Sequence, residues 1–268
     1  MMGLMKNRFY GKYYKFISDT NDVLAIIISH ANEGDMLQVI LEGGAYFISD
    51  TKSVLVNSDT ITFNIDQDDL VIKGTVVLSN YHPLKKKVMG PFTYLPLECK
   101  HEIYSMSHQV NGKLNINGES IKYTNSLGYI EGDKGKNFPK KYVWYNSLLK
   151  DCTLTLAVAT IPLLGFIRFK GILCFIKTKD QEYYLCTYNG AKLKLINDKR
   201  LIIKKGKYTL ELNYDASSGH HLKAPVKGNM SRYIKESVTT PTSYRLLYKE
   251  EVLIDNTDPT SSLEYMWE

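Results

Sequence analysis

The sequence lacks any apolar run long enough to cross a membrane as a helix. Its longest uncharged run extends from Cys152 to Ile167 and contains Pro162, whereas a membrane helix needs about 20 apolar residues. No secretory signal is visible in residues 1–16, because four basic residues interrupt that segment. Glycine-rich phosphate loops, nucleophile elbows and Cys-x-x-Cys pairs are also missing. We expect a soluble protein without a transmembrane segment. The absence of these catalytic and phosphate-binding motifs excludes several common enzyme classes.

The sequence has few cysteines, and no two of them lie close together along the chain. The four cysteines lie in apolar or strand-like surroundings and are Cys99, Cys152, Cys174 and Cys186. This pattern predicts reduced core thiols rather than a disulfide framework, and it favours a cytoplasmic location.

Positive charge exceeds negative charge, with a net charge of +6, but most basic residues are scattered. The exceptions are Lys85-Lys86-Lys87 and the stretch from Lys199 to Lys207. Neither run is interleaved with aromatic residues as a nucleic-acid surface would be, so no nucleic-acid partner is expected. A solvated loop and a lysine-edged strand explain them best. An anionic substrate or membrane surface stays open as an alternative.

Strand patterns dominate what is present. Hydrophobic residues make up 44% of the 268 residues, and twenty are tyrosines, which favour strands. Residues 208–214 alternate between apolar and polar side chains, as in a half-buried strand, whereas Val23 to His30 is a continuous apolar run typical of a buried strand. No long helical period appears. The fold class predicted is all-β and mostly antiparallel, with two β halves of similar length, residues 1–139 and 140–268, that meet near Pro139.

Three Asn-Gly pairs predict hairpin turns, because both central residues of a type I′ turn need positive φ. The pairs at Asn111-Gly112 and Asn117-Gly118 predict a three-stranded meander from Ile103 to Tyr123. The pair at Asn189-Gly190 predicts the second turn of a hairpin unit that spans residues 171–196.

The segment from Met89 to Trp144 places carboxylates and histidines among glycines and aromatic residues. Within it, Glu131 and Asp133 interrupt strands that otherwise look buried. A buried carboxyl group must be paired, hydrogen-bonded or held neutral by a raised pKa. The structural alternative is that both carboxylates bind backbone amides and fix the crossing of two sheets.

A metal site was the other alternative in this segment. Cys99 and His101 would share one face of a strand, and His108 could join them as a ligand. Their spacing fits no standard zinc pattern, so structural packing is favoured, and neither a bound metal nor a cofactor is expected.

Several elements of this segment together resemble the tocopherol cyclase family. They are Met89-Gly90-Pro91-Phe92, the block from Pro96 to His101, Ser105-Met106-Ser107-His108, and the stretch from Gly128 to Trp144 that contains Phe138-Pro139. Outside the segment, the likeness includes Phe9-Tyr10-Gly11, Ala159-Thr160-Ile161-Pro162, Thr187 to Ala191, and Ala224-Pro225 with Gly228-Asn229-Met230. The resemblance therefore spans almost the whole chain. Two tryptophans of the family pattern are replaced, by Lys12 and Lys134.

The resemblance implies two lipocalin-like β-barrel or sandwich halves that hold a hydrophobic small molecule in an internal cavity. For the founding enzymes it implies closure of a prenylated quinol into a chromanol ring, which is an intramolecular lyase or isomerase reaction. Such a reaction needs an acid that protonates an alkene and aromatic faces that stabilise the cation. A carrier that binds an apolar metabolite without any reaction is the alternative. The oligomeric state stays open.

Roles follow for individual residues. Asp133 is the first choice of acid and Glu131 the second, and His101 would orient or reprotonate the acid. The expected ligand-binding residues are Glu98, Tyr129, Tyr142 and Trp144. A regular strand would put both carboxylates on one face, but the intervening Gly132 permits a bulge, so their relative geometry is open.

Overall fold

The structure is a computed structural model that describes residues 7–67, 69–163 and 167–267. Strands make up 71% of the structure, and the only helical pieces of the described chain are three short 3₁₀ helices, Thr51–Ser53 (η1), Gly90–Tyr94 (η2) and Thr187–Asn189 (η3). The strands form two antiparallel sheets, neither of which closes into a barrel in this described part. The predicted all-β class with two lipocalin-like halves is confirmed.

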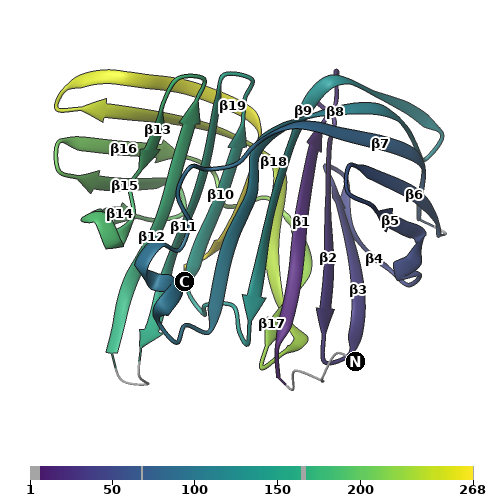
Figure 1. The fold of residues 1–268 in the computed structure, drawn as a ribbon, viewed down its shortest axis with the longest axis horizontal. Helices are drawn as coiled ribbons and strands as arrows, with labels where there is room; N and C mark the ends of the chain where they lie inside the picture. Colours follow the sequence, from purple (N-terminus) through teal and green to yellow (C-terminus); the bar gives the residue numbers. More distant parts are fainter. Residues whose placement is uncertain (1–6, 68, 164–166, 268) are drawn as a thin grey trace.

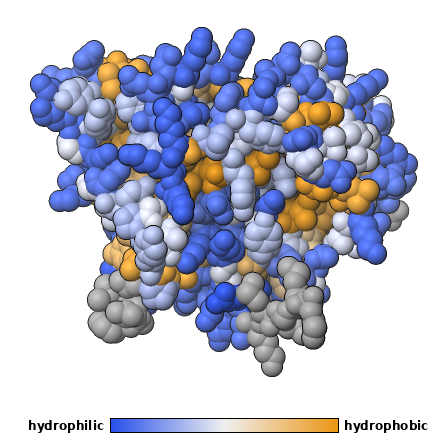
Figure 2. All heavy atoms as spheres, in the orientation of Figure 1, coloured by the Kyte–Doolittle hydropathy of each residue, from blue (hydrophilic) through white to orange (hydrophobic). Residues whose placement is uncertain are grey.

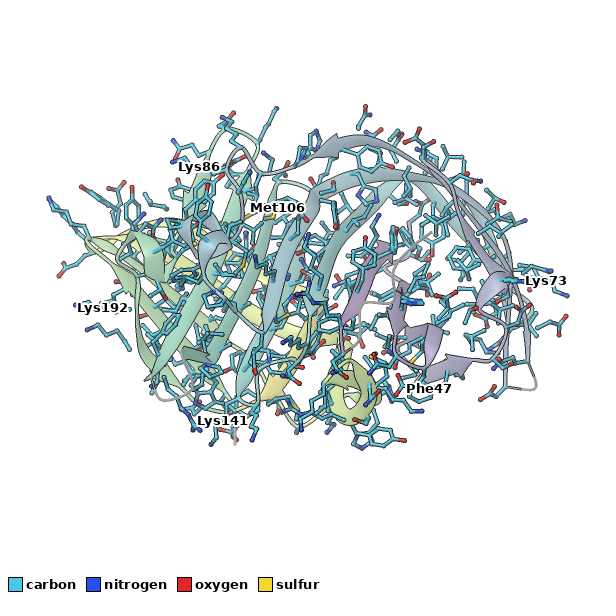
Figure 3. The ribbon with its side chains drawn as sticks, turned by 60° about the horizontal axis from the view of Figure 1, so that its bottom comes forward. Phe47, Lys73, Lys86, Met106, Lys141 and Lys192 are labelled. Carbon is cyan, nitrogen blue, oxygen red and sulfur yellow. The ribbon has the colours of Figure 1, made fainter. Side chains whose placement is uncertain are left out.

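The first sheet has nine strands in the order β4-β3-β2-β1-β9-β8-β7-β6-β5. In chain order these are Phe9–Ile17 (β1), Val23–Ala31 (β2), Gly34–Leu41 (β3), Gly44–Ile48 (β4), Val54–Val56 (β5), Thr60–Gln67 (β6), Leu70–His82 (β7), Cys99–Ile116 (β8) and Glu119–Gly135 (β9). Figure 1 shows β1 to β3 side by side on the right, and Figure 3 shows the sheet curving into an arch. The first and last strands of this half, β1 and β9, are neighbours.

The second sheet has ten strands in the order β13-β12-β11-β10-β19-β18-β16-β15-β14, with β17 paired to β18. These are Tyr142–Leu148 (β10), Cys152–Leu163 (β11), Ile167–Thr178 (β12), Glu182–Tyr184 (β13), Lys192–Ile196 (β14), Arg200–Lys205 (β15), Tyr208–Asn213 (β16), His220–Val226 (β17), Asn229–Tyr248 (β18) and Glu251–Met266 (β19). The change of sheet falls between Gly135 and Tyr142. The division into domains at residue 139 stays a prediction.

Local patterning predicted single strands well. The apolar run from Val23 forms β2, and the alternating stretch from Tyr208 forms β16 with Leu210 and Leu212 buried. Alternation works here because successive side chains of a strand point to opposite faces of the sheet.

Two of the three Asn-Gly predictions were wrong. Asn117-Gly118 joins β8 to β9 with positive φ at both residues. At Asn111-Gly112, strand β8 continues and only its register against β9 shifts, so the three-stranded meander is a two-stranded hairpin with a bulge. A Cβ on Gly112 would lie 2.4 Å from the Thr75 carbonyl oxygen, so this glycine permits close approach of β7 rather than a turn.

Asn189-Gly190 ends η3 instead of turning a hairpin. Asn189 is the last residue of that 3₁₀ helix, and Gly190 follows it with a φ of 95°. The next strand, β14, pairs with β15 and not with β13, so the predicted second turn does not form. The first turn, between β12 and β13, does form.

Apolar side chains pack into three large clusters. One lies within the first sheet, around Phe16, Phe63 and Leu114, and another lies within the second sheet, around Tyr145, Leu156 and Leu210. The third brings β1 and β9 together with β10 and β18, and it includes Tyr129, Trp144 and Val238. This third cluster joins the two sheets and contains the predicted site.

The segment 83–98, between β7 and β8, links the two sheets across one face. In Figure 1 it passes in front of β11 and β12. The Phe92 ring packs on Phe169 and Tyr188, with centroid separations of 5.7 and 5.6 Å. Figure 2 shows hydrophobic residues at the centre of this face, surrounded by hydrophilic ones. Phe92 of this segment therefore covers aromatic side chains of β12 and η3.

All four cysteines are unpaired, and three of them are fully buried. Among the described residues, no helix has the length and apolar character required to span a membrane.

Candidate active site

Strand pairing brings the predicted acids and histidine together. On β9, Asp133 lies opposite His101 of β8, and Glu131 lies opposite Ile103. The pairing of β9 with β1 runs without a register shift through the same stretch. Both carboxylates therefore share one face of a regular strand, and Gly132 forms no bulge. A Cβ at Gly132 would lie 2.8 Å from the Gly11 carbonyl oxygen, so this glycine allows β1 to approach.

The His101 imidazole bridges the two carboxyl groups. Its Nδ1 lies 3.2 Å from Asp133 Oδ1, and its Nε2 lies 3.5 Å from Glu131 Oε2. The side chain of Glu131 is only 6% exposed and that of Asp133 is 23% exposed. Burial lowers the pKa of His101, but the charges of Glu131 and Asp133 outweigh it and raise that pKa to about 9. His101 is therefore an imidazolium at neutral pH.

Glu131 differs from Asp133 in how far its carboxyl group is removed from water. Burial raises the pKa of Glu131 to about 7, although His101 and two hydrogen bonds oppose the shift. Those hydrogen bonds come from the Tyr129 hydroxyl at 2.5 Å and the Trp144 indole nitrogen at 3.1 Å, and both reach Oε2. Glu131 can therefore hold a proton near neutral pH, which an acid catalyst requires.

Two further buried carboxyl groups reach the same region from the second sheet, and the sequence analysis did not single out either as a site residue. Glu236 of β18 and Glu264 of β19 face each other across their strands. The hydroxyl of Tyr13 donates to Glu236 Oε1 at 2.9 Å, and that of Tyr142 donates to Glu264 Oε2. Burial raises the pKa of Glu236 well above its usual range, and the charge of Glu264 adds to that rise. Burial also raises the pKa of Glu264, to about 8, with smaller contributions from the charges of Glu131 and Asp133.

One sequence feature would have pointed to Glu236. It stands between Ile234 and Val238 in a strand with a period of two, so its side chain is directed to the buried face. No comparable apolar frame surrounds Glu264, whose neighbours at the same spacing are Ser262 and Met266.

Three of these carboxyl groups, those of Glu131, Asp133 and Glu264, line a largely apolar cavity of about 160 Å³. This is roughly ten times the space that one water molecule needs. Its polar lining includes His101, Glu131, Asp133 and Glu264, and the rest is mostly aromatic and aliphatic. Trp144 lies edge-on to Tyr13 in the wall, with 5.2 Å between ring centroids. Such a wall suits an apolar ligand with reactive atoms next to an acid.

The expected ligand-binding residues occupy three kinds of position. Tyr142 and Trp144 line the cavity. Tyr129 is fully buried behind Glu131, which it binds, and it is not part of the lining. Glu98 is exposed and outside the lining, and its backbone oxygen accepts hydrogen bonds from the amides of Lys136 at 2.7 Å and Asn137 at 3.4 Å.

The two lysines that replace tryptophans of the family pattern lie in different hollows. Lys12 lines the cavity, and its ammonium group lies 5.0 Å from the centroid of the Tyr104 ring. Lys134 is exposed and lies in a neighbouring groove.

His101, Glu131 and Asp133 are the described residues whose ligand atoms cluster tightly enough to hold a metal ion, all within 4.8 Å of one another. Cys99 donates from its sulfur to Asp133 at 3.4 Å, whereas His108 lies apart, against Ser105 and Tyr81. The contemplated set of Cys99, His101 and His108 therefore does not assemble. The expectation of no bound metal stays a prediction.

The two curved antiparallel sheets around an apolar cavity define a lipocalin-like fold. Solved structures share it over nearly the whole chain. Kievitone hydratase from Nectria haematococca has a TM-score of 0.55 and 9% identity, covering 98% of this chain and 90% of that one. A putative AttH from Nitrosomonas europaea has a TM-score of 0.56 and 11% identity, covering 98% and 93%. CghA has a TM-score of 0.61 and 8% identity, covering 98% and 89%.

At such low identity the likeness shows the fold alone. No protein-family model matches the chain, and no curated protein matches it. The resemblance to tocopherol cyclase is thus supported at the level of the lipocalin-like, tocopherol-cyclase-like fold. Membership of that family stays a prediction.

Proposed function

We propose that this protein is an acid–base enzyme of the cyclase or hydratase type, acting on an unsaturated, hydrophobic small molecule in the cavity. The observation that carries the proposal is the Glu131 carboxyl group, which is buried at an apolar wall with a pKa raised by burial to about 7. A neutral carboxylic acid in an apolar pocket can protonate an alkene. The shared fold with a hydratase and the resemblance to tocopherol cyclase both support this class of reaction.

The proposed reaction begins with proton transfer from Glu131 to the alkene, which forms a tertiary cation. The rings of Tyr13, Tyr142 and Trp144 would stabilise that cation by cation–π interaction. A hydroxyl group of the substrate, or water, then forms the new C–O bond and releases its proton to the Asp133 carboxylate. His101 contacts both carboxyl groups, so it can return that proton to Glu131. The resemblance assigns a prenyl-type substrate to this scheme.

The sequence placed Asp133 first as the acid and Glu131 second, and the geometry favours the reverse order. The side chain of Asp133 is more exposed than that of Glu131, and its carboxyl group contacts the His101 ring at 3.2 Å. Glu131 is almost fully buried and adjoins aromatic side chains. Asp133 therefore suits the role of base and Glu131 the role of acid.

Proton delivery to carbon can be followed in heavy water. Apolar extract from cells that make the protein is incubated with the purified protein in D₂O, and products are analysed by mass spectrometry. The wild type should yield a product with one deuterium on carbon. Glu131→Gln should slow this about 10²–10⁴-fold, since an amide cannot replace the acid. Asp133→Asn should also slow turnover while leaving the ligand bound.

Glu119→Gln is the matched control, because it makes the same change at an exposed position of the same strand. It should leave deuterium incorporation unchanged. Undiminished incorporation in Glu131→Gln would remove Glu131 as the acid. A ligand that co-purifies and is recovered without deuterium would make the protein a carrier.

A further inference from the structure

A groove of about 400 Å³ adjoins the apolar cavity. The two hollows share Met89, His101, Gly132 and Asp133 as lining residues. Their chemistry differs, because the groove is lined by five lysines, Lys85, Lys86, Lys87, Lys100 and Lys134. Its acidic lining residues are Glu102 and Asp133, and Asp133 already contacts His101. The groove therefore carries excess positive charge next to the candidate acid.

Three of these ammonium groups have no partner among the residues that the structure describes. Lys100 donates to the Thr93 carbonyl oxygen at 2.9 Å, and Lys86 lies 5.4 Å from the centroid of the Tyr184 ring. Lys85, Lys87 and Lys134 make no described side-chain contact and are exposed. These three groups can bind an anion without giving up a contact within the protein.

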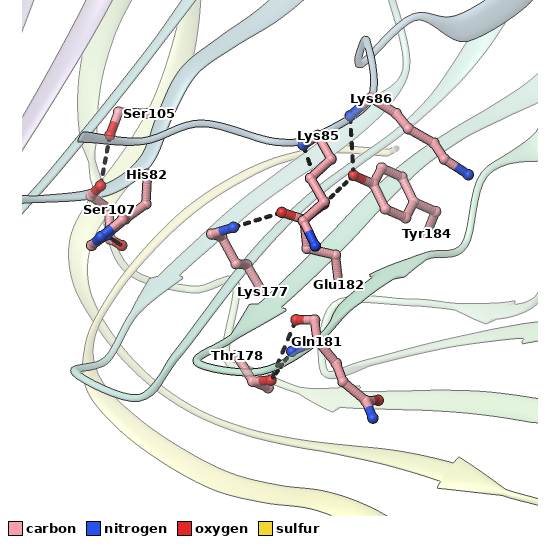
Figure 4. A network of polar contacts seen from close by, with 10 residues as sticks. All are labelled: His82, Lys85, Lys86, Ser105, Ser107, Lys177, Thr178, Gln181, Glu182 and Tyr184. Carbon is pink, nitrogen blue, oxygen red and sulfur yellow. Dashed lines mark hydrogen bonds and ion pairs between the residues drawn. The ribbon is translucent and has the colours of Figure 1, made fainter. Parts of the chain in front are cut away.

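The backbone that carries Lys85 and Lys86 is tethered to the second sheet (Figure 4). The Lys85 amide donates to Glu182 Oε2 at 3.2 Å, and the Lys86 amide donates to the Tyr184 hydroxyl at 3.3 Å. Glu182 also accepts a hydrogen bond from Lys177 Nζ at 2.5 Å. The lysine loop is thus held at the groove before any ligand arrives, which lowers the entropic cost of binding.

We propose that the cavity ligand is an amphiphile whose anionic group, such as a carboxylate, is bound by the groove lysines while its apolar body occupies the cavity. This inference rests on the proposed function, because it assigns the substrate class of the same site. Lysine ammonium groups bind oxyanions as point charges. An extended molecule that fills both hollows must pass their shared wall, and its central atoms then lie beside His101 and Asp133.

The test compares two fluorescent probes with the same apolar body, 11-(dansylamino)undecanoic acid and its methyl ester. We expect the acid to bind about tenfold more tightly than the ester at low salt, because several exposed ion pairs act together. That preference should shrink in about 0.5 M salt, where charges are screened. The triple variant Lys85→Ala, Lys87→Ala, Lys134→Ala should lose the preference and bind the ester as the wild type does.

The control variant Lys192→Ala, Lys194→Ala, Lys204→Ala removes the same charge from exposed positions on β14 and β15. Those positions line neither hollow, and Figure 3 labels Lys192 and Lys86 at separate places on the molecule. It should keep the preference for the acid. A control that loses the preference would show that net charge alone accounts for it, which overturns the proposal.

The remaining outcomes separate this proposal from the proposed function. Equal binding of acid and ester would overturn the anionic-group proposal and leave the apolar cavity intact. Failure of both probes to bind would remove the cavity and, with it, the proposed enzyme. Sedimentation with phosphatidylglycerol vesicles that depends on the three lysines, without any preference for the acid probe, would make the groove a membrane contact and overturn the proposal.

Discussion

Two buried carboxylate regions of this molecule are built differently. Asp258 is fully buried and accepts four hydrogen bonds, from Ser147 Oγ, the Leu148 amide, and the amide and hydroxyl of Thr260, at 2.6 to 3.2 Å. In the cluster of Glu131, Glu236 and Glu264, by contrast, Glu236 Oε2 has no partner among the described residues. Burial raises the pKa of all three of these glutamates.

This difference distinguishes a carboxyl group that stabilises the fold from one that is available for catalysis. Donors that saturate a buried carboxylate stabilise its charged form and fix the strands that supply them. At Glu131 the effect of burial on the pKa outweighs that of its two hydrogen-bond donors, so the carboxyl group can keep its proton. Next to a cavity it can give that proton to a ligand. A buried carboxyl group therefore joins strands at Asp258 and is available for catalysis at Glu131.

The largest effect on folding should come from Asp258→Ala. It leaves four buried donors without an acceptor, and each buried hydrogen bond to a charged group contributes about 1.5–3 kcal/mol. We expect the free energy of unfolding to fall by about 3 kcal/mol or more, measured by urea denaturation. Asp255→Ala, at a half-exposed ion pair on the same strand, should cost at most about 1 kcal/mol. Equal losses in the two variants would contradict the contrast between the two regions.

The pH dependence of stability should be the next largest effect. In the folded chain the pKa of Glu131 rises from 4.5 to about 7, and that of Glu264 rises from 4.5 to about 8. Between pH 4.5 and 8 the folded chain therefore binds more protons than the unfolded chain. The free energy of unfolding must fall as the pH rises across this window, by about 1.4 kcal/mol for each unit of pKa difference.

Other groups modify this profile. Burial lowers the pKa of His108 from 6.5 to about 4, so below pH 6.5 this one group opposes the decline. The pKa of His101 is raised from 6.5 to about 9. The contribution of His101 to the free energy of unfolding therefore also decreases as the pH rises above 6.5. Burial lowers the pKa of Lys15 to about 8. The contribution of Lys15 to the free energy of unfolding therefore has the opposite sign, and it acts only above pH 8. Urea denaturation at several pH values should show the decline, and Glu264→Gln should flatten it. A profile that rises from pH 5 to 8 would contradict the raised pKa values.

Glu182→Gln should have the smallest effect. Glu182 resembles Asp258 in having several donors, but it tethers the surface loop at Lys85 rather than the core. Loss of its charge should reduce the free energy of unfolding by about 1 kcal/mol. It should also speed amide exchange at Lys85 and Lys86 in hydrogen–deuterium exchange. Glu119→Gln should do neither, and unchanged exchange at both lysines in Glu182→Gln would show that the tether does not order the loop.

The sequence supported predictions about strands better than predictions about turns. The apolar run of β2 and the alternation of β16 predicted buried and half-buried strands, which is what formed. The Asn-Gly pairs allow positive φ without requiring a turn, so the partner strand decided each case. Gly112 accommodates close approach of β7, and Gly190 ends a 3₁₀ helix.

The sequence likewise predicted only part of the candidate site. His101, Glu131 and Asp133 were grouped through the family resemblance, and the pairing of β8 with β9 brings them together. Glu264 lies on a strand whose pairing with β10 and β18 depends on the whole second sheet. The neighbourhood of Lys85, Lys87 and Lys134 likewise depends on where the segment 83–98 is tethered.

By itself, the sequence determined the all-β class and the alternation of buried and exposed positions. These properties follow from local backbone geometry, which has a period of two in any strand. The tertiary structure alone decided which carboxyl groups lose their contact with water, and hence that the pKa of Glu131 is raised. Desolvation depends on every chain segment that packs around a group, and here those segments come from both sheets.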